Sequence, residues 1–319
     1  MASVTLVESA KLAQDELVAG VIENIITVNQ SFQALPFDDI DGNSLKYNRE
    51  SVLGGVGVTG VGTTLDDSTD LNPITGETAP VKAAATFTEV YSGLTTILGD
   101  AQVNGMIEAT RSAENSQSGV QIASKAKHCG RVFQFMMVNG TGTGNQFDGL
   151  INLCAAGQTI TSATDGQNIS FDILDNLMDL VTVKDGMVDY FMMHARTRRA
   201  YRALLRALGG ASVNEVVELP SGEEVIAYSG VPIFRNDYIP ITQTQGAWTA
   251  ATTVFAGTFD DGSRTNGLAG LTAKNASGIN VVDVGESETA DERIYRVKWY
   301  AGLALFSEKA LACAPGIKN

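Results

Sequence analysis

The longest regular pattern of apolar positions in the chain covers residues 108–138 and predicts one helix. Small and apolar side chains recur there at intervals of three, four or seven positions, and the segment contains no proline. Its one local breaker is the pair Ser118-Gly119. A helix of about thirty residues would be roughly 45 Å long, whereas globular helices average about 11–12 residues. Such a rod buries little surface within one subunit, which favours a building block of a large assembly.

Two further patterns predict extended arms. Residues 5–28 have apolar side chains at helical spacing, and Thr5 and Glu8 have the spacing of a capping box, so we expect an amphipathic helix. Residues 37–98 include strand-like alternation and five glycines between Gly54 and Gly62, which predicts a long β-hairpin with a flexible tip. A hairpin with so few large apolar groups cannot stabilise itself, so we expect a neighbouring subunit to hold it.

After Leu150 the pattern becomes that of a compact section in which helices and strands alternate. Ser170 is a candidate N-cap for a helix, and a second helix is expected over residues 197–208, ended by Gly209-Gly210. The expected strands cover residues 188–194, 213–219, 224–228, 230–234, 253–256, 279–284 and 293–306. The fold class is therefore α+β.

Composition narrows the class of protein. The chain has 319 residues, 44% of them hydrophobic and 18% charged, which is typical of a folded protein. A formal net charge of −14 disfavours a broad surface that grips DNA or an anionic membrane, but a container need not grip its contents. Charged residues occur early, at Glu8 and Lys11, so no signal peptide is expected, and no apolar run is long enough to predict a membrane span.

The cysteines and histidines do not form the pattern of a metal site. Cys129, Cys154 and Cys313 are far apart in sequence and no Cys-x-x-Cys occurs, so a reducing cytoplasm is the expected setting. His128 and His194 each lack a second ligand at a useful spacing. We predict no metal site.

Patterns of catalysis and cofactor binding are equally incomplete. The five-glycine stretch is not followed by the Gly-Lys-Ser/Thr of a phosphate-binding loop. Gly140, Gly142 and Gly144 follow a predicted helix, whereas a dinucleotide fingerprint follows a strand. No Gly-x-Ser-x-Gly elbow occurs. We therefore predict no catalytic residue and no cofactor, and a small hydrolase is the least favoured alternative.

One concentrated basic feature stands out in this acidic chain. It comprises five arginines: Arg196, Arg198, Arg199, Arg202 and Arg206. Arg198, Arg202 and Arg206 are four positions apart and share one face of the predicted helix. This face is either solvated, or forms salt bridges between subunits, or contacts enclosed nucleic acid. Glu77 and Lys82 of the predicted hairpin are further candidates for contacts between subunits.

The order of these parts resembles the major capsid proteins of tailed bacteriophages of the Hong Kong 97 type. The resemblance covers essentially the whole chain. Three short segments carry it: Asn139-Gly140 through Phe147-Asp148-Gly149-Leu150, Tyr228-Ser229-Gly230-Val231-Pro232-Ile233, and Tyr300-Ala301-Gly302-Leu303-Ala304-Leu305. The fold it implies has an N-terminal arm (residues 1–36), an extended loop (37–98), a peripheral domain with a spine helix (99–146 and 277–319) and an axial domain (147–276).

The resemblance also implies a function and partners. Such proteins assemble through pentamers and hexamers into an icosahedral shell around double-stranded DNA, which they enclose without sequence-specific binding. The shell would form in the bacterial cytoplasm and become the capsid of a virion, with a portal protein and, where needed, separate scaffolding or decoration proteins. Some members crosslink a loop lysine to a neighbour, and Lys46 and Lys82 lie in the corresponding section, but no asparagine partner stands out.

An encapsulin-like compartment, the same fold enclosing a protein cargo, is the alternative interpretation. The long glycine-rich arm and the chain length favour the phage interpretation, and nucleic acid in native particles would separate the two. A tail or fibre protein would show more repeats and a more uniformly β pattern.

Overall fold

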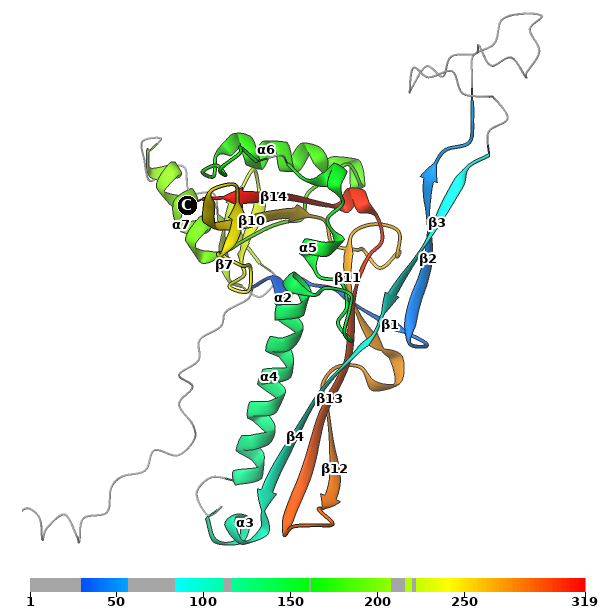
Figure 1. The fold of residues 1–319 in the computed structure, drawn as a ribbon, viewed down its shortest axis with the longest axis vertical. Coiled ribbons are helices and arrows are strands. Elements are labelled where there is room, and N and C mark those ends of the chain that lie inside the picture. The colour runs from blue at the N-terminus through cyan, green and yellow to red at the C-terminus, as the bar shows by residue number, and fades with distance from the viewer. Residues whose placement is uncertain are drawn as a thin grey trace, which may run out of the picture. The chain divides into compact units, whose positions relative to one another are not determined.

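The computed structural model describes residues 30–56, 84–111, 116–160, 162–207, 216–219 and 222–318 (Figure 1). The predicted helix over residues 5–28 lies outside the described residues, as do the tip of the predicted hairpin, Glu77 and Lys82. The chain divides into two compact units. Of the described residues, the first unit holds Leu98–Gly130 and Asn280–Lys298, and the second holds residues 30–97, Arg131–Ile279 and 299–318.

The first unit is built on antiparallel strands. Its elements are β4 (Thr95–Asn104), α3 (Gly105–Arg111), the first part of α4 (Gln117–Asn139), β12 (Asn280–Glu286) and the first part of β13 (Glu292–Leu305). β13 pairs with both β12 and β4. The Arg296 guanidinium makes two hydrogen bonds of 2.8 Å to the Asp100 carboxylate, and this holds the pKa of Asp100 below its usual range. The paired strands and the bidentate interaction between Arg296 and Asp100 stabilise this unit.

The long helix predicted over residues 108–138 is confirmed as α4, but its predicted start is wrong, because α3 (Gly105–Arg111) and α4 (from Gln117) are separate helices. Ser116 is not helical, and its hydroxyl oxygen accepts a hydrogen bond of 3.1 Å from the Gly119 backbone N–H, as an N-cap does. The Glu108 carboxylate accepts two more hydrogen bonds, from the Ser118 backbone N–H and hydroxyl. Side-chain hydrogen bonds therefore start a new helix inside an apolar pattern that continues past the break. α4 still has 23 residues, yet among the described residues neither it nor any other helix is long and apolar enough to cross a membrane.

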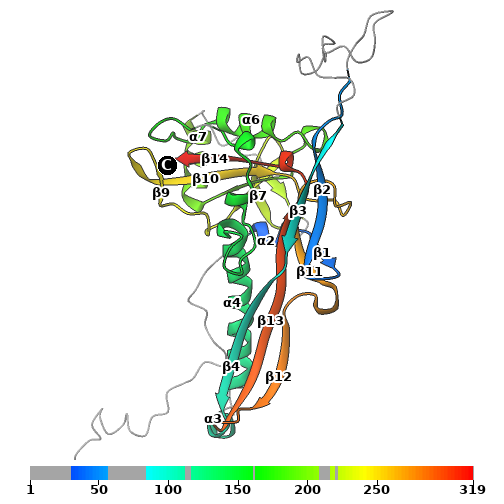
Figure 2. The same ribbon diagram turned by 45° about the vertical axis from the view of Figure 1, so that its right-hand side comes forward.

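A seven-stranded mixed sheet forms the core of the second unit (Figure 2). In sheet order its strands are β14 (Leu311–Ile317), β10 (Trp248–Gly257), β5 (Tyr190–Met193), β8 (Val231–Arg235), β7 (Glu224–Tyr228) and β6 (Val216–Glu218), with β9 (Gln243–Gln245) paired to β10. β5 and β8 are parallel, and the other pairings are antiparallel. The central strand β5 is buried along its whole length.

Two helices pack on this sheet. α6 (Phe171–Leu180) lies against β14 and β10, and α7 (Ala195–Ala207) lies against β8. As predicted, Ser170 is the N-cap of α6, and its side chain accepts a hydrogen bond from the Ile173 backbone N–H. α6 buries Ile173, Leu174 and Leu177 in the core. The polar side chains of both helices are thereby left on the outside of the unit.

A second set of strands in this unit carries the base of the predicted hairpin. β1 (Phe37–Ile40) pairs parallel with β11 (Leu268–Ala273), and β11 pairs antiparallel with residues 301–305 of β13. The hairpin strands β2 (Ser44–Val52) and β3 (Thr86–Gly93) pair antiparallel, with Leu45 opposite Ser92. The other helices in the part of the chain that the structure describes are α2 (Gln30–Ala34), α5 (Leu150–Leu153) and the 3₁₀ turns Ala156–Gln158, Lys184–Gly186, Lys274–Ala276 and Glu308–Ala310.

Some strand pairs join segments that the sequence assigned to different domains. β14 belongs to the predicted peripheral segment 277–319, yet it pairs with β10 of the predicted axial segment. β11 lies in the axial segment and pairs with β13 of the peripheral segment. The division into arm, extended loop, peripheral domain and axial domain stays a prediction.

Candidate functional site

The loop after α4 returns the chain on itself through a close contact of two glycines. The Gly140 backbone N–H donates to the Met136 carbonyl oxygen (2.8 Å), and the Gly149 N–H donates to the Gly140 carbonyl oxygen (2.9 Å). Between them, Gly142, Gly144 and Asn145 have φ values of +67°, +62° and +65°, a left-handed backbone that glycine and asparagine adopt most readily. The Phe-Asp-Gly-Leu segment, whose Asp148 forms an isolated β-bridge with Thr141, is therefore the second half of a tight return that leads into α5.

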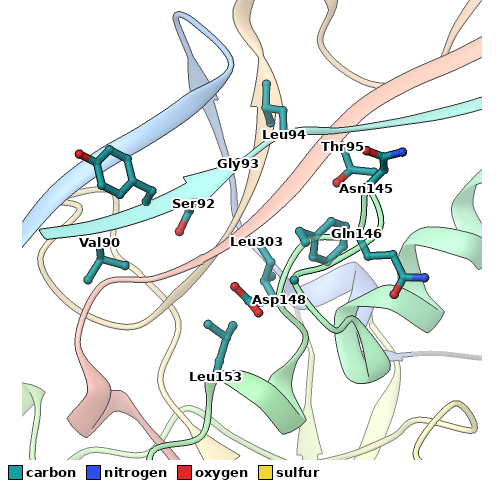
Figure 3. A pocket seen from close by; sticks show the side chains of 13 residues that line it. Val90, Ser92, Gly93, Leu94, Thr95, Asn145, Gln146, Asp148, Leu153 and Leu303 are labelled. Atoms are coloured by element: carbon teal, nitrogen blue, oxygen red, sulfur yellow. The ribbon is translucent and has the colours of Figure 1, made fainter.

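This return and the base of the hairpin enclose a pocket of about 290 Å³ (Figure 3). Residues 90–95 form one wall, and residues 145–148 form another. In Figure 3 the side chain of Leu303 lies between Ser92 on one side and Gln146 on the other. Asp148 is the only carboxylate among the lining residues, so the pocket does not pair an acid with a base. The pocket lies where the return after α4 meets the base of the hairpin.

The ribbon β2–β3 exposes large apolar side chains. Leu53, next to the end of β2, is 72% exposed, and Phe87 on β3 is 64% exposed. Val52 and Tyr91 are exposed as well. A two-stranded ribbon is marginally stable in water by itself, and exposed apolar patches are typical of interaction surfaces.

The base of the ribbon is fixed to the chain after β13. The Tyr47 hydroxyl donates a 2.7 Å hydrogen bond to the Leu305 carbonyl oxygen. The Arg49 guanidinium donates to the carbonyl oxygens of Leu305 (2.6 Å) and Phe306 (3.0 Å) and forms an ion pair of 2.7 Å with Glu308. The ribbon therefore leaves the subunit in a defined direction.

The predicted arginine face lines a groove of about 510 Å³. Arg198, Arg202 and Arg206 of α7 form one wall, which confirms that they share a helix face. The opposite wall comes from β6 and β7: Val216, Glu224 and Ile226. We call this the arginine groove. The structure separates Arg196 from it, because the Arg196 guanidinium is partly buried and donates to the Ala250 carbonyl oxygen (2.6 Å).

Positive charge is concentrated in the arginine groove. Burial lowers the pKa of Arg198, the neighbouring cations Arg202 and Arg235 act in the same direction, and the carboxylates of Glu223 and Asp237 oppose the shift. Arg198 donates a hydrogen bond to the neutral Gln30 side chain (3.2 Å), while Arg202 and Arg206 are exposed. Among the described residues that line it, the groove has three guanidinium groups and one carboxylate. It therefore favours an anionic partner.

α7 begins at a titratable side chain. His194 directly precedes the helix, and its Nδ1 accepts a 3.1 Å hydrogen bond from the Arg196 backbone N–H. This hydrogen bond needs an unprotonated Nδ1. Burial lowers the pKa of His194, Asp237 opposes this shift, and Arg196 and Arg235 add to it. The N-terminus of α7 is therefore capped by a neutral histidine.

We expect the stability of the folded chain to fall as His194 becomes protonated. Because its folded pKa lies below the unfolded value of about 6.5, the unfolded state binds more protons in this window. The stabilisation that neutral His194 provides is fully present above the unfolded pKa. It is lost as the pH falls from the unfolded pKa through the folded pKa. The melting temperature of the wild type should fall more between about pH 7.5 and 5.5 than that of His194→Asn. The asparagine keeps a hydrogen-bond acceptor at the start of the helix but does not titrate. Equal declines would contradict this role.

Two cysteines that are distant in sequence lie together. The Thr159 hydroxyl is 3.7 Å from the Cys154 sulfur and 3.3 Å from the Cys313 sulfur, and both thiols are free. A hydrogen bond with Cys313, followed by burial, raises the pKa of Cys154, so this thiol stays protonated near neutral pH. Cys129 is buried, and His128 is exposed. Among the residues that the structure describes, no three His, Cys, Asp or Glu side chains converge as a metal site requires.

The chain matches a model of a known protein family. The model of the SrpI-like family, described as type 2A encapsulin shell protein SrpI-like, matches residues 141–318, which is more than half of the chain. These residues include the return after α4, the arginine groove and the seven-stranded sheet. No curated protein matches the chain by sequence.

Solved structures similar to the chain include an encapsulin complex, a capsid and a phage structure. The holo-SrpI encapsulin complex from Synechococcus elongatus PCC 7942 is 17% identical with a TM-score of 0.72, and the match covers 99% of this chain and 96% of that one. The capsid of a native GTA particle is 12% identical with a TM-score of 0.66, covering 99% of both chains. Microbacterium phage Oxtober96 gives 14% identity and a TM-score of 0.62, again covering 99% of both chains. The predicted Hong Kong 97-like α+β fold is confirmed.

Proposed function

Because the chain belongs to the SrpI-like family of type 2A encapsulin shell proteins, we propose that its copies close into a compartment that encloses a protein cargo. The family match over residues 141–318 carries this proposal. The chain is a shell-forming protein of the Hong Kong 97 fold, and the match favours the encapsulin alternative over the phage capsid that the sequence first suggested. We place the compartment in the cytoplasm rather than in a virion.

The physical properties of the subunit support a self-assembling shell. The ribbon β2–β3 presents apolar side chains that its own subunit leaves exposed. The arginine groove offers concentrated positive charge on a chain with a net charge of −14. A chain with an exposed apolar ribbon, a basic groove and an otherwise acidic surface can form complementary contacts with further copies of itself. A shell protein needs no catalytic residue or cofactor, and the proposal assigns none.

A DNA-filled capsid is the second candidate. It is supported by the shared fold of the native GTA capsid and of Microbacterium phage Oxtober96, which match 99% of this chain as the encapsulin complex does. In that case double-stranded DNA would be the contents, and a portal with scaffolding or decoration proteins would be the partners. Pentamers and hexamers would be the assembly units in either case.

The contents of purified particles test the proposal. Particles isolated from the native source would be treated with nuclease, and their protein and nucleic acid would then be measured separately. We expect closed shells with a second protein in fixed proportion and little nuclease-resistant nucleic acid. Shells filled with protected double-stranded DNA would overturn the cargo compartment in favour of the capsid. A chain that stays monomeric at high concentration would contradict both.

Loss of the ribbon anchor should impair assembly while the subunit remains folded. In Arg49→Ala the base of the ribbon loses its hydrogen bonds to Leu305 and Phe306 and its ion pair with Glu308. Hydrogen bonds that involve a charged group contribute about 1.5–3 kcal/mol, which is less than the stability of a typical domain. We expect a lower melting temperature and a several-fold lower yield of shells by size-exclusion chromatography and electron microscopy.

Lys46→Ala is the matched control for Arg49→Ala. Lys46 also lies on β2, but it pairs across the ribbon with Glu89 on β3, and both side chains are about half exposed. Exposed ion pairs contribute little. The control should therefore assemble as the wild type does. If Arg49→Ala also gave the wild-type yield, the anchor would have no part in assembly.

A further inference from the structure

We propose that the arginine groove of one copy receives the acidic face of α6 from the next copy in a ring. The acidic face consists of Asp172, Asp175 and Asp179, all of them exposed. This contact presupposes the proposed shell and names the surfaces that join its subunits. It uses two different surfaces of the same chain, so each copy offers one to each neighbour.

The acidic face is formed by the same pattern that buries the other side of α6. Its aspartates are three and four positions apart, so they lie on one side of the helix. Ile173, Leu174 and Leu177 occupy the opposite side and are buried. α6 therefore presents a negative surface that is held rigidly by the core.

The two surfaces match in length and in charge. At about 1.5 Å per residue, Asp172 and Asp179 are separated by roughly 10.5 Å along α6, and Arg198 and Arg206 by roughly 12 Å along α7. Three carboxylates face three guanidinium groups. Arginine and carboxylate form hydrogen bonds in a bidentate geometry, which gives such a contact orientation as well as attraction.

Neither surface is neutralised within its own subunit by the other. Among the ion pairs between described residues, none joins an α6 aspartate to an arginine of the groove. Asp175 accepts a 2.6 Å hydrogen bond from the Tyr228 hydroxyl, and Asp172 accepts a 3.4 Å one from Asn176. These neutral partners position the carboxylates without cancelling their charge.

The composition of the groove favours a protein surface over nucleic acid. Glu224 on the opposite wall would repel a phosphate backbone, and Val216 and Ile226 offer apolar contact to a side chain. Because the two complementary surfaces differ, the contact is head-to-tail, and repeating it gives a ring or an open helix. A ring is the geometry that a shell built from pentamers and hexamers requires.

Charge reversal of each surface tests the contact. The arginine reversal is Arg202→Glu with Arg206→Glu, and the aspartate reversal is Asp172→Arg with Asp179→Arg. All four positions are exposed, so the subunits should fold, which circular dichroism and thermal unfolding would verify. Each reversal places like charges together, and we expect at least a tenfold loss of oligomers in light scattering after size-exclusion chromatography.

The combined variant distinguishes this pairing from a general effect of charge. With all four substitutions the attraction is restored with opposite sign, so oligomers should return. An equimolar mixture of the two single reversals should form mixed oligomers that neither forms alone. Arg199→Glu is the control, because Arg199 is exposed on α7 but does not line the groove, and it should assemble normally.

The outcomes separate the contact from the proposed function. Normal oligomers from either reversal, or failure of both the combined variant and the mixture to recover, would overturn the contact. Normal shells that lose only bound nucleic acid in the arginine reversal would assign the groove to nucleic acid and overturn it as well. If the wild type forms rings that respond as expected but never close into shells, the proposed function is contradicted while the contact is supported.

Discussion

Gly149→Ala should strongly destabilise the second unit, although it adds only one methyl group. A Cβ atom at Gly149 would lie 2.5 Å from the Gly140 backbone nitrogen and 2.7 Å from the carbonyl oxygens of Met136 and Val138. All three atoms are backbone, so no side chain can rotate away. The backbone at Gly149 has φ −88°, which any residue adopts, so the requirement is for space and not for a left-handed conformation.

The cost of this substitution follows from what must move. Relief of the clash requires that the return after α4 separate from the last turn of the helix, which breaks the hydrogen bond from the Gly149 N–H to the Gly140 carbonyl oxygen. Overpacking typically lowers the free energy of unfolding by about 1–3 kcal/mol. Because the clashing atoms here are backbone and cannot move aside, we expect a loss of about 3 kcal/mol or more. Soluble yield and urea denaturation of the variant measure the effect.

Gly130→Ala is the matched control. Gly130 lies inside α4, and an added Cβ would meet no atom within 4 Å. Alanine in a helix interior is more stable than glycine by about 0.5–1 kcal/mol, so this variant should gain stability. If Gly149→Ala were as stable as the wild type, the close approach of the two glycines would have no energetic role.

Amphipathic helices and half-exposed strands could be predicted from the sequence because one side of each faces water. α6, α7 and β7 closely follow their predicted positions. The strands β11 and β14 were missed. Both are almost wholly buried, so their polar and apolar positions do not alternate. β14 also contains Pro315 and Gly316, which normally argue against a strand.

The arginine groove combines one relation that the sequence predicts with others that it does not. The spacing of Arg198, Arg202 and Arg206 predicts their common face, because that relation is local to one helix. Glu224 on the opposite wall and the separation of Arg196 depend on tertiary packing, which no local pattern records. The proximity of Cys154 to Cys313 has the same origin, since the segment after α5 meets β14 only in the folded unit.

Phe133→Ala should be the most destabilising truncation in the aromatic cluster of the second unit. Phe133 is fully buried, and its ring centroid lies 4.8 Å from that of Trp299 and 5.4 Å from that of Phe147. Phe32 and Phe37 lie at 5.7 and 5.6 Å. One ring therefore contacts α2, β1, the return after α4 and β13, and phenylalanine truncations at such sites cost about 3–5 kcal/mol.

Phe135→Ala separates the loss of this cluster from the loss of an aromatic residue in the same helix. Phe135 is two positions further along α4, is 47% exposed, and has a ring contact with Tyr238 at 6.2 Å. Its truncation removes little buried surface, so we expect a loss of about 1 kcal/mol or less in urea denaturation. Truncation leaves a cavity only where the neighbouring residues cannot move in to fill it. The rings around Phe133 come from four separate segments, so we expect the space to remain open. Similar losses in the two variants would therefore mean that these segments are not held together through Phe133.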